Sequence, residues 1–252
     1  MGSLDGLVVL VTGGNGGIGL AMARAMAGAG ADVAIWGRDA GKNEAASAAL
    51  AAAGARVHAA VCDVSDEQQT REVFAETVDR LGRIDAVFAN AAHGGIIKPV
   101  ADLSLAEWRE VMAINLDGAF LTLREGARHL IERNEGGSLV AVGSTSSIHG
   151  AAANDAYGAS KTALAGLTRS MAVGLARHRI RVNCLVPGWT ITGLSAGGYA
   201  DDRFRDATVN RTPVRRWADP DEMGPAAVFL ADPAQTYHTG QTLVVDGGYT
   251  VF

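Results

Sequence analysis

The sequence has few cysteines. Among its 252 residues there are two, Cys62 and Cys184, and both stand in apolar runs. Two such cysteines make no disulfide framework, and we expect them to be small buried core residues. A chain without a disulfide framework suits a reducing compartment, so we expect a cytoplasmic protein.

Long apolar runs and basic clusters are also missing. No apolar stretch reaches the roughly 20 residues that a membrane-spanning helix needs, and the first residues lack the basic-then-apolar pattern of a secretory signal. The formal net charge is −5, and Arg215 with Arg216 forms a pair rather than a patch. We therefore expect neither a nucleic-acid nor a membrane partner. No histidine or cysteine spacing fits a zinc site, so we expect no metal.

Short runs rich in valine and isoleucine alternate along the chain with alanine-rich segments of helical spacing. Such runs are typical of strands buried on both faces of a parallel sheet. Their alternation with helices predicts right-handed crossovers, with helices covering both faces of the sheet. No linker divides the chain, so we expect one α/β domain, 1–252, with a doubly wound sheet. The strands are predicted at 7–12, 32–36, 57–61, 86–89, 138–142, 180–186 and 242–245.

Capping residues predict where several helices begin. A Ser, Thr or Asp followed three residues later by Glu or Gln can bond reciprocally with the first turn of a helix, and proline suits the first helical position. Two long helices are predicted at about 105–132 and 154–177. The predicted caps are Ser65 with Gln68, Ser104 with Glu107, and Asp219 with Pro220 and Glu222.

A glycine-rich segment, "VTGGNGGIG" at 11–19, follows the first predicted strand and opens the first predicted helix. Glycines at 13, 17 and 19 allow a tight turn and a close approach of the backbone to a pyrophosphate, which the helix N-terminus then faces. Alone, the segment is also compatible with a flexible turn. Its place between a strand and a helix favours a dinucleotide site.

Tyr157 and Lys161 stand four residues apart in "YGASK". In a helix this spacing puts both on one face, which by itself is also compatible with a solvated helix surface. A phenol has an ordinary pKa of about 10 and needs a lower one to exchange a proton near neutral pH. One ammonium at about 4 Å contributes roughly 4 kcal/mol at an effective dielectric constant of about 20, enough for most of that change. The spacing therefore predicts that Lys161 lowers the pKa of Tyr157.

The chain resembles the short-chain dehydrogenase/reductase family in seven segments that occur in the family's order. These are "TGGNGGIG", "VFANAA", "AINLDG", "VGSTSS", "YGASK", "RVNCLVPGWTIT" and "GQTLVVDGG". The chain departs from the family at Ala89 and Ala92, where Asn and Gly are usual. The resemblance implies a seven-stranded doubly wound fold and hydride transfer between a nicotinamide and a secondary alcohol or ketone.

The resemblance also implies catalytic roles. Tyr157 would act as general acid and base, and Lys161 would tune it and bond the nicotinamide ribose. Ser144 would hold the substrate oxygen, although it could be an ordinary strand-end serine. Asn115 would bind a water that connects to the lysine, although it could instead cap or kink a helix.

By the same resemblance, further residues would bind the cofactor. Asp63, with the main chain of Val64, would contact the adenine, although Asp63 could be a simple turn residue. Asn90 would lie along the adenosine ribose, and Thr192 would bond the carboxamide. The implied cofactor-binding set is Gly13, Asn15, Gly17, Ile18, Gly19, Arg38, Asp63, Val64, Asn90, Tyr157, Lys161 and Thr192.

The end of the second predicted strand bears on the choice of cofactor. NAD-preferring folds of this kind place an acid there, whereas an arginine suits the 2′-phosphate of NADP. Here Gly37 replaces the acid and Arg38 follows it, with Lys42 adding charge and Asp39 able to oppose it. The planar guanidinium fork matches a phosphate, so we expect NADP in preference to NAD.

The long connection at about 188–215 is predicted to be a substrate lid, because it far exceeds the usual length of roughly 4–6 residues. The resemblance further implies a homotetramer, with the two long alanine- and glycine-rich helices packing between subunits. Two alternatives to a ketone reductase remain: a dinucleotide-binding sensor or scaffold without catalysis, and a dehydratase or epimerase on the same fold.

Overall fold

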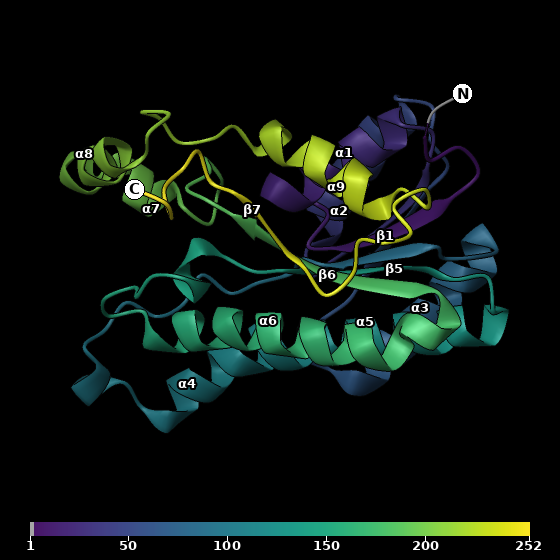
Figure 1. Cartoon of the computed structure of the whole chain (residues 1–252), viewed down its shortest axis with the longest axis horizontal. Coiled ribbons are helices and arrows are strands. Elements are labelled where there is room, and N and C mark those ends of the chain that lie inside the picture. The colour runs from purple at the N-terminus through teal and green to yellow at the C-terminus, as the bar shows by residue number, and fades with distance from the viewer. Residues whose placement is uncertain (1–2) are drawn as a thin grey trace.

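The computed structural model describes residues 3–252. Seven strands form one sheet in the order β3-β2-β1-β4-β5-β6-β7, and every neighbouring pair is parallel (Figure 1). The predicted doubly wound sheet is confirmed. The strands are β1 (Val8–Thr12), β2 (Asp32–Gly37), β3 (Val57–Val61), β4 (Ala86–Ala89), β5 (Gly137–Val142), β6 (Ile180–Pro187) and β7 (Thr242–Val245).

Helices cover the two faces of the sheet, so the molecule has three layers (Figure 1). Helices α1, α2 and α9 lie on one face, and α3, α4, α5 and α6 lie on the other. Short helices α7 and α8 stand apart at one end. The bounds are α1 (Gly17–Gly28), α2 (Ala40–Ala51), α3 (Glu67–Leu81), α4 (Leu105–Met112), α5 (Gly118–Arg133), α6 (Asp155–Leu175), α7 (Ala196–Ala200), α8 (Asp202–Arg211) and α9 (Gly224–Ala231).

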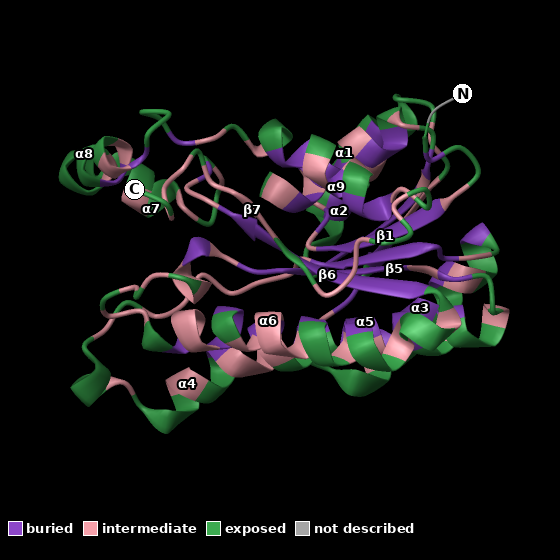
Figure 2. Cartoon of the chain, in the orientation of Figure 1, coloured by how far each residue is buried: buried purple, intermediate pink, exposed green. Residues whose placement is uncertain are grey.

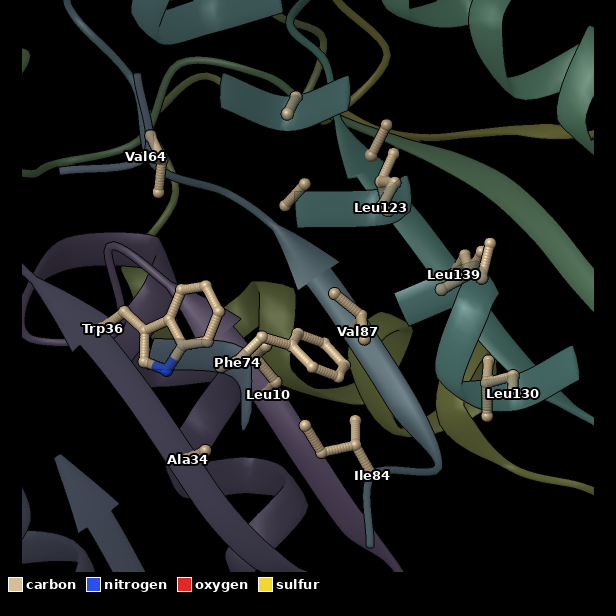
Figure 3. Close-up of a cluster of buried hydrophobic side chains, with 14 of the residues drawn as sticks. Leu10, Ala34, Trp36, Val64, Phe74, Ile84, Val87, Leu123, Leu130 and Leu139 are labelled. Carbon is tan, nitrogen blue, oxygen red and sulfur yellow. The ribbon is translucent and has the colours of Figure 1, made fainter. Parts of the chain in front are cut away.

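Successive side chains of each strand point to opposite faces of the sheet, and this divides the buried core into two clusters. In β1, Val8 and Leu10 pack against α3 and α5, whereas Val9 and Val11 pack against α1 and α9. This follows from the two-residue period of a strand, which sends successive side chains to opposite faces. Trp36 lies in the first cluster (Figure 3), and its indole N–H donates to Thr77 Oγ1 at 3.0 Å, which satisfies the one polar atom of this buried ring.

The prediction that every strand is buried on both faces is wrong for the two outermost strands. Burial is complete in β1, β4 and β6, whereas β3 and β7 are partly exposed along their length (Figure 2). Val61 at the end of β3 is 52% exposed. An outermost strand has a neighbour on one side only, and the flanking helices cover it less fully than they cover the central strands.

Two of the three predicted caps are correct. Ser104 and Glu107 form the expected reciprocal box at the start of α4. Asp219 and Glu222 form another, which opens a short 3₁₀ turn (Pro220–Met223) that leads into α9. The cap at Ser65 is wrong by one residue, since the side chain of Asp66 accepts the Gln69 N–H at the start of α3. The predicted cysteine burial is confirmed for both thiols.

The strand order places the connections that carry the candidate site residues. The chain order reverses between β1 and β4, which lie side by side in the sheet. In doubly wound sheets, ligands bind beyond the carboxyl ends of the strands at such a reversal. The glycine segment follows β1 and Asn90 follows β4, so both lie at this point. Helices α7 and α8 and the C-terminus lie together at one end of the molecule (Figure 1).

Candidate active site

The glycine segment forms a tight turn between β1 and α1. Gly13 and Gly17 have φ of 64° and 50°, a left-handed conformation that glycine adopts without strain. A Cβ added at Gly19 would lie 2.3 Å from the Gly13 carbonyl oxygen, whereas one at Gly16 would meet nothing within 4 Å. No side chain caps the start of α1, so its first N–H groups are available to an anion. The turn therefore fits a dinucleotide pyrophosphate.

Asn90 and Thr12 hold this turn in place. The Asn90 side-chain amide donates to Thr12 O at 2.9 Å, and the Asn90 main-chain N–H donates to Thr12 Oγ1 at 3.0 Å. The end of β4 is thereby tied to the end of β1. Asn90 was expected beside a ribose; the structure shows in addition that its amide supports the backbone of the turn. Thr12 begins the glycine motif, but the sequence did not predict its supporting role.

The end of β2 presents Arg38 to solvent. Arg38 is exposed, and Asp39, which could have neutralised it, instead caps α2 by accepting the Lys42 N–H at 3.0 Å. The space beside Gly37 is filled by Asn15 of the glycine turn: a Cβ added at Gly37 would lie 2.1 Å from Asn15 Nδ2. The cation at this strand end is therefore available to a ligand, and there is little room for an acid at Gly37.

Asn43 of α2 links these elements and was not found from the sequence. It is buried, its Oδ1 accepts from Asn15 Nδ2 at 2.7 Å, and its Nδ2 donates to Gly37 O and Ala60 O at 2.9 Å each. One side chain thus joins the glycine turn to the ends of β2 and β3. A buried amide with all of these bonds made is typical of a positioning residue.

Asp63 follows β3 and closes the turn into α3. Its Oδ1 accepts from the Ser65 main-chain N–H at 3.0 Å and from the Ser65 hydroxyl at 2.7 Å. Burial acts to raise the pKa of Asp63, but these bonds and the nearby charge of Arg38 outweigh it and hold that pKa below its ordinary value. Val64 is buried against Gly118. Asp63 is thus a charged turn residue near Arg38.

Asn115 lies in a π-helical turn, Ala113–Asp117, which interrupts the predicted long helix between α4 and α5. Its Oδ1 accepts from the His93 N–H at 2.7 Å, and its Nδ2 donates to His93 O at 3.0 Å and to Ser160 Oγ at 3.2 Å. The Ser160 hydroxyl donates to Tyr157 O. A π turn is often found at a functional site, and here it connects the segment after β4 with α6.

Ser144 lies just beyond the end of β5, near Tyr157 of α6. Ser144 precedes a 3₁₀ turn (Thr145–Ser147) and accepts from the Ser146 N–H at 3.2 Å. Burial raises the pKa of the Tyr157 phenol, and a hydrogen bond with Ser144 partly opposes it. A hydroxyl near a phenol can, together with it, hold one substrate oxygen.

Lys161 lies on the same face of α6 as Tyr157, but its ammonium does not bond the phenol. Nζ lies 5.7 Å from the centroid of the Tyr157 ring and donates to Val142 O at 2.8 Å. The sequence-based expectation that Lys161 lowers the pKa of Tyr157 is therefore not met in this structure, where burial dominates. Burial also lowers the pKa of Lys161 to about 8, opposed by the nearby Cys184 sulfur.

The connection after β6 reaches over the glycine turn. A Cβ added at Gly17 would lie 3.3 Å from Thr192 Cγ2, and Thr192 is fixed by Ser195, whose hydroxyl accepts from the Thr192 N–H at 3.0 Å. The predicted lid is not an irregular loop, since α7 and α8 form within it. It is anchored by Trp189, which stacks on Trp217 at a centroid distance of 4.9 Å.

The structure thus gathers the candidate residues at one edge of the sheet in two groups. One group surrounds α6, where Asn115 reaches the main chain of Tyr157 through Ser160. The other surrounds the glycine turn, with Asn90 below it and Thr192 against it. Within residues 3–252, no group of three or more His, Cys, Asp or Glu side chains could hold a metal ion. In the same range, every helix is too short or too polar to cross a membrane.

Comparisons with known proteins agree over nearly the whole chain. The model of a family described as Enoyl-(Acyl carrier protein) reductase matches residues 13–250. Gluconate 5-dehydrogenase of Gluconobacter oxydans is 36% identical over 251 residues, covering 99% of this chain and 96% of that protein. 2,5-Dichloro-2,5-cyclohexadiene-1,4-diol dehydrogenase of Sphingobium indicum is 35% identical over 251 residues, covering 99% of each.

Solved structures agree as well. A gluconate 5-dehydrogenase of Burkholderia cenocepacia, in complex with NADP and tartrate, has a TM-score of 0.94 and 36% identity over 99% of this chain and 97% of that one. The doubly wound sheet and the glycine turn define a dinucleotide-binding protein. The chain belongs to the short-chain dehydrogenase/reductase family, and its relatives support an oxidoreductase activity with a nicotinamide cofactor.

Proposed function

We propose that the protein is an NAD(P)-dependent oxidoreductase acting on a secondary alcohol or ketone, with Tyr157 as the residue that moves the proton. The observation that carries the proposal is the position of Lys161 on the same face of α6 as Tyr157, with Nζ 5.7 Å from the centroid of the phenol ring, near Ser144 at the carboxyl edge of the sheet. When bound, the nicotinamide accepts or supplies the hydride.

The proton chemistry follows from the state of the phenol. Because burial raises the pKa of Tyr157, the phenol is protonated near neutral pH and can donate to a carbonyl oxygen, as ketone reduction requires. Ser144 holds that oxygen beside the phenol. For alcohol oxidation the phenolate must form, and the positive charge of Lys161 then favours it. Asn115 holds α6 and the segment that follows β4 in place around Ser144 and Tyr157. We propose that it also orients a water on the path of the proton.

The cofactor would be held by groups from several elements. The N–H groups of the glycine turn would bind its pyrophosphate, Asp63 and Val64 its adenine, and Asn90 and Lys161 its riboses. Thr192, which lies against Gly17, would bond the carboxamide. We propose NADP in preference to NAD, because the exposed guanidinium of Arg38 is free of Asp39. The residues of the glycine turn that would bind the pyrophosphate are Gly13, Asn15, Gly17, Ile18 and Gly19.

We also propose an assembly and a location for the protein. Val173 of α6 is 84% exposed and Phe120 of α5 is 42% exposed. Apolar side chains on these two helices fit the expected homotetramer, in a cytoplasmic setting. Light scattering at micromolar concentration measures the mass directly, and a monomer would rule the tetramer out.

Replacing Tyr157 with phenylalanine tests the catalytic assignment. Tyr157→Phe removes the phenolic proton and keeps the ring, so turnover on a panel of ketones should fall by about 10²–10⁴-fold, while NADPH affinity, measured by fluorescence, stays nearly unchanged. Tyr237→Phe is the matched control, because Tyr237 is fully exposed, and it should keep wild-type turnover. Substantial activity in Tyr157→Phe would remove Tyr157 as the proton carrier.

A further inference from the structure

One arginine near the candidate site has no acidic partner. Arg211 is half-buried at the end of α8, and among the described residues 3–252 no carboxylate oxygen lies within 4.0 Å of its guanidinium. Two other arginines of the same region, Arg205 and Arg216, are both paired with carboxylates. Withdrawing a guanidinium from water without a counter-charge is unfavourable, so an anion that binds there would remove an existing penalty.

The partners that Arg211 does have are aromatic. Its Nη2 lies 3.1 Å from His149 Nδ1, and its guanidinium carbon lies 4.6 Å from the centroid of the Tyr249 ring. The rings of His149 and Tyr249 meet edge-on at 5.8 Å. Arginine has donors only, so the His149 nitrogen accepts, and the Tyr249 ring holds the guanidinium plane by a cation–π contact. The fork is thus oriented by a ring nitrogen and an aromatic face, and not by a carboxylate.

The acid on the segment after β7 is engaged by the main chain and is not paired with Arg211. Asp246 precedes Tyr249, and both of its carboxylate oxygens accept main-chain N–H groups at 2.8 Å, one from Gly248 and the other from Thr250. The carboxylate is committed to shaping the turn that carries Tyr249. Arg211 therefore remains available to an anion from outside the chain.

Arg211, His149 and Tyr249 lie on the same side of the sheet as the proposed reacting residues. His149 follows the 3₁₀ turn that begins beside Ser144, and its main-chain N–H donates to Thr145 O at 2.9 Å. Tyr249 follows β7 and Arg211 follows β6, so the group is built from the connections that leave β5, β6 and β7. Carboxyl ends of parallel strands share one edge of a sheet, which places Arg211 on the side of Ser144 and Tyr157.

We propose that Arg211, oriented by His149 and Tyr249, binds a carboxylate of the substrate, so that the substrate is a hydroxy acid or the corresponding keto acid. A single guanidinium fork matches the two oxygens of a carboxylate in a bidentate geometry, and one cation balances a single negative charge. The reacting carbon would lie at Tyr157 and the carboxylate at Arg211. The inference rests on the proposed oxidoreductase function and names its substrate class.

The test compares keto acids with their methyl esters, which have nearly the same shape and no charge. Wild type should show higher kcat/KM for the acids. Arg211→Gln should lower the acid value by about tenfold or more, as expected for a charged hydrogen bond, and leave the ester value nearly unchanged. Arg211→Lys, which keeps the charge and loses the fork, should fall between them. Arg203→Gln is the control, because Arg203 is an exposed arginine of the same helix, and it should change neither substrate.

Calorimetric titration of the same acids and esters, with NADP present, separates this inference from the proposed function. Acid binding that Arg211→Gln weakens, without turnover in wild type, would overturn the proposed reaction and keep the carboxylate site. Turnover in wild type with equal values for acids and esters, or an acid preference that Arg211→Gln leaves intact, would overturn the carboxylate site and keep the reaction. An unchanged thermal midpoint shows that Arg211→Gln is folded.

Discussion

The Lys161 ammonium lies over the ring of Tyr157, 5.7 Å from its centroid. It is buried and donates to the main-chain oxygen of Val142. Burial acts on the two residues in opposite directions: it raises the pKa of Tyr157 and lowers the pKa of Lys161 to about 8. In both cases it favours the neutral form. A charged Lys161 near neutral pH therefore lowers the free energy of unfolding.

This destabilisation should appear as a pH-dependent difference in the free energy of unfolding between wild type and Lys161→Met. The pKa of Lys161 is lower in the folded state, about 8, than in the unfolded state, about 10.4. Between these two pKa values the unfolded chain binds more protons than the folded chain, so the free energy of unfolding increases as the pH rises from about 8. Lowering the pH back to about 8 removes this gain. From about pH 7 to about pH 9.5, wild type should gain roughly 2 kcal/mol relative to Lys161→Met. Urea unfolding without cofactor measures it.

Lys42→Met serves as the control for that comparison, because Lys42 is exposed. Its replacement should leave the pH dependence of the unfolding free energy like that of wild type. If Lys161→Met and wild type keep a constant difference across this pH range, the pKa of Lys161 is not lowered by folding.

Lys161→Ala should also act on turnover. Without the ammonium the phenolate of Tyr157 is less favoured, so the basic limb of the pH profile for alcohol oxidation should move to higher pH, and cofactor affinity should fall. Thr162→Ala is the control: it removes one bond to Gly158 O on the same helix and should not move the profile. A profile that Lys161→Ala leaves in place would mean that Lys161 stays with Val142 O and does not tune the phenol.

Asn115→Ala should lower stability, because it leaves the half-buried main-chain groups of His93 without these partners. We expect a loss of about 1–3 kcal/mol in urea unfolding, from two hydrogen bonds whose His93 partners are only partly accessible to water. Ser160→Ala removes only the bond between Ser160 and Nδ2 of Asn115 and the one to Tyr157 O, so it should be milder. If kcat of folded Asn115→Ala equals that of wild type, Asn115 has a structural role alone.

The fold was predictable because its signals are local. Uniformly apolar runs marked the strands, and the glycine segment lay between the first strand and the first helix. The failures have a common cause. Whether Val61 is buried, and whether Asp66 rather than Ser65 caps α3, depend on what packs nearby in three dimensions. The π turn at Asn115 likewise has no period that a sequence pattern can show.

The candidate site was predictable as a set of residues and less so as a set of contacts. The spacing of the motif identified Tyr157 and Lys161 as candidates. It could not show that the Lys161 ammonium donates its hydrogen bond to Val142 O. Asn43 gave no signal, since an asparagine in an alanine-rich helix looks like a solvated residue. Arg211 and His149 are far apart in the chain, and their contact depends on how α8 packs.

The structure alters how the cofactor preference should be tested. An acid placed at Gly37 should favour NAD, because it accepts from the ribose 2′-hydroxyl and repels a 2′-phosphate. However, a Cβ at Gly37 would lie 2.1 Å from Asn15 Nδ2 and 2.6 Å from Asn43 Oδ1. Gly37→Asp alone would displace Asn15 and disturb the glycine turn. The paired variant Gly37→Asp with Asn15→Gly removes the contact with Asn15 and leaves Asn43, whose Oδ1 then no longer accepts from Asn15, as the one side chain that has to shift.

Wild type should show higher kcat/KM with NADPH than with NADH. Arg38→Ala should lower the NADPH value by about tenfold or more, since a charged hydrogen bond contributes about 1.5–3 kcal/mol, and should leave the NADH value nearly unchanged. The paired variant Gly37→Asp with Asn15→Gly should then prefer NADH, whereas Gly37→Asp alone should lose activity with both cofactors. Arg80→Ala, at an exposed position on α3, is the control and should change neither value. A wild type that prefers NADH, with Arg38→Ala changing neither cofactor, would show that Arg38 is a solvated cation and that the assignment to NADP is wrong.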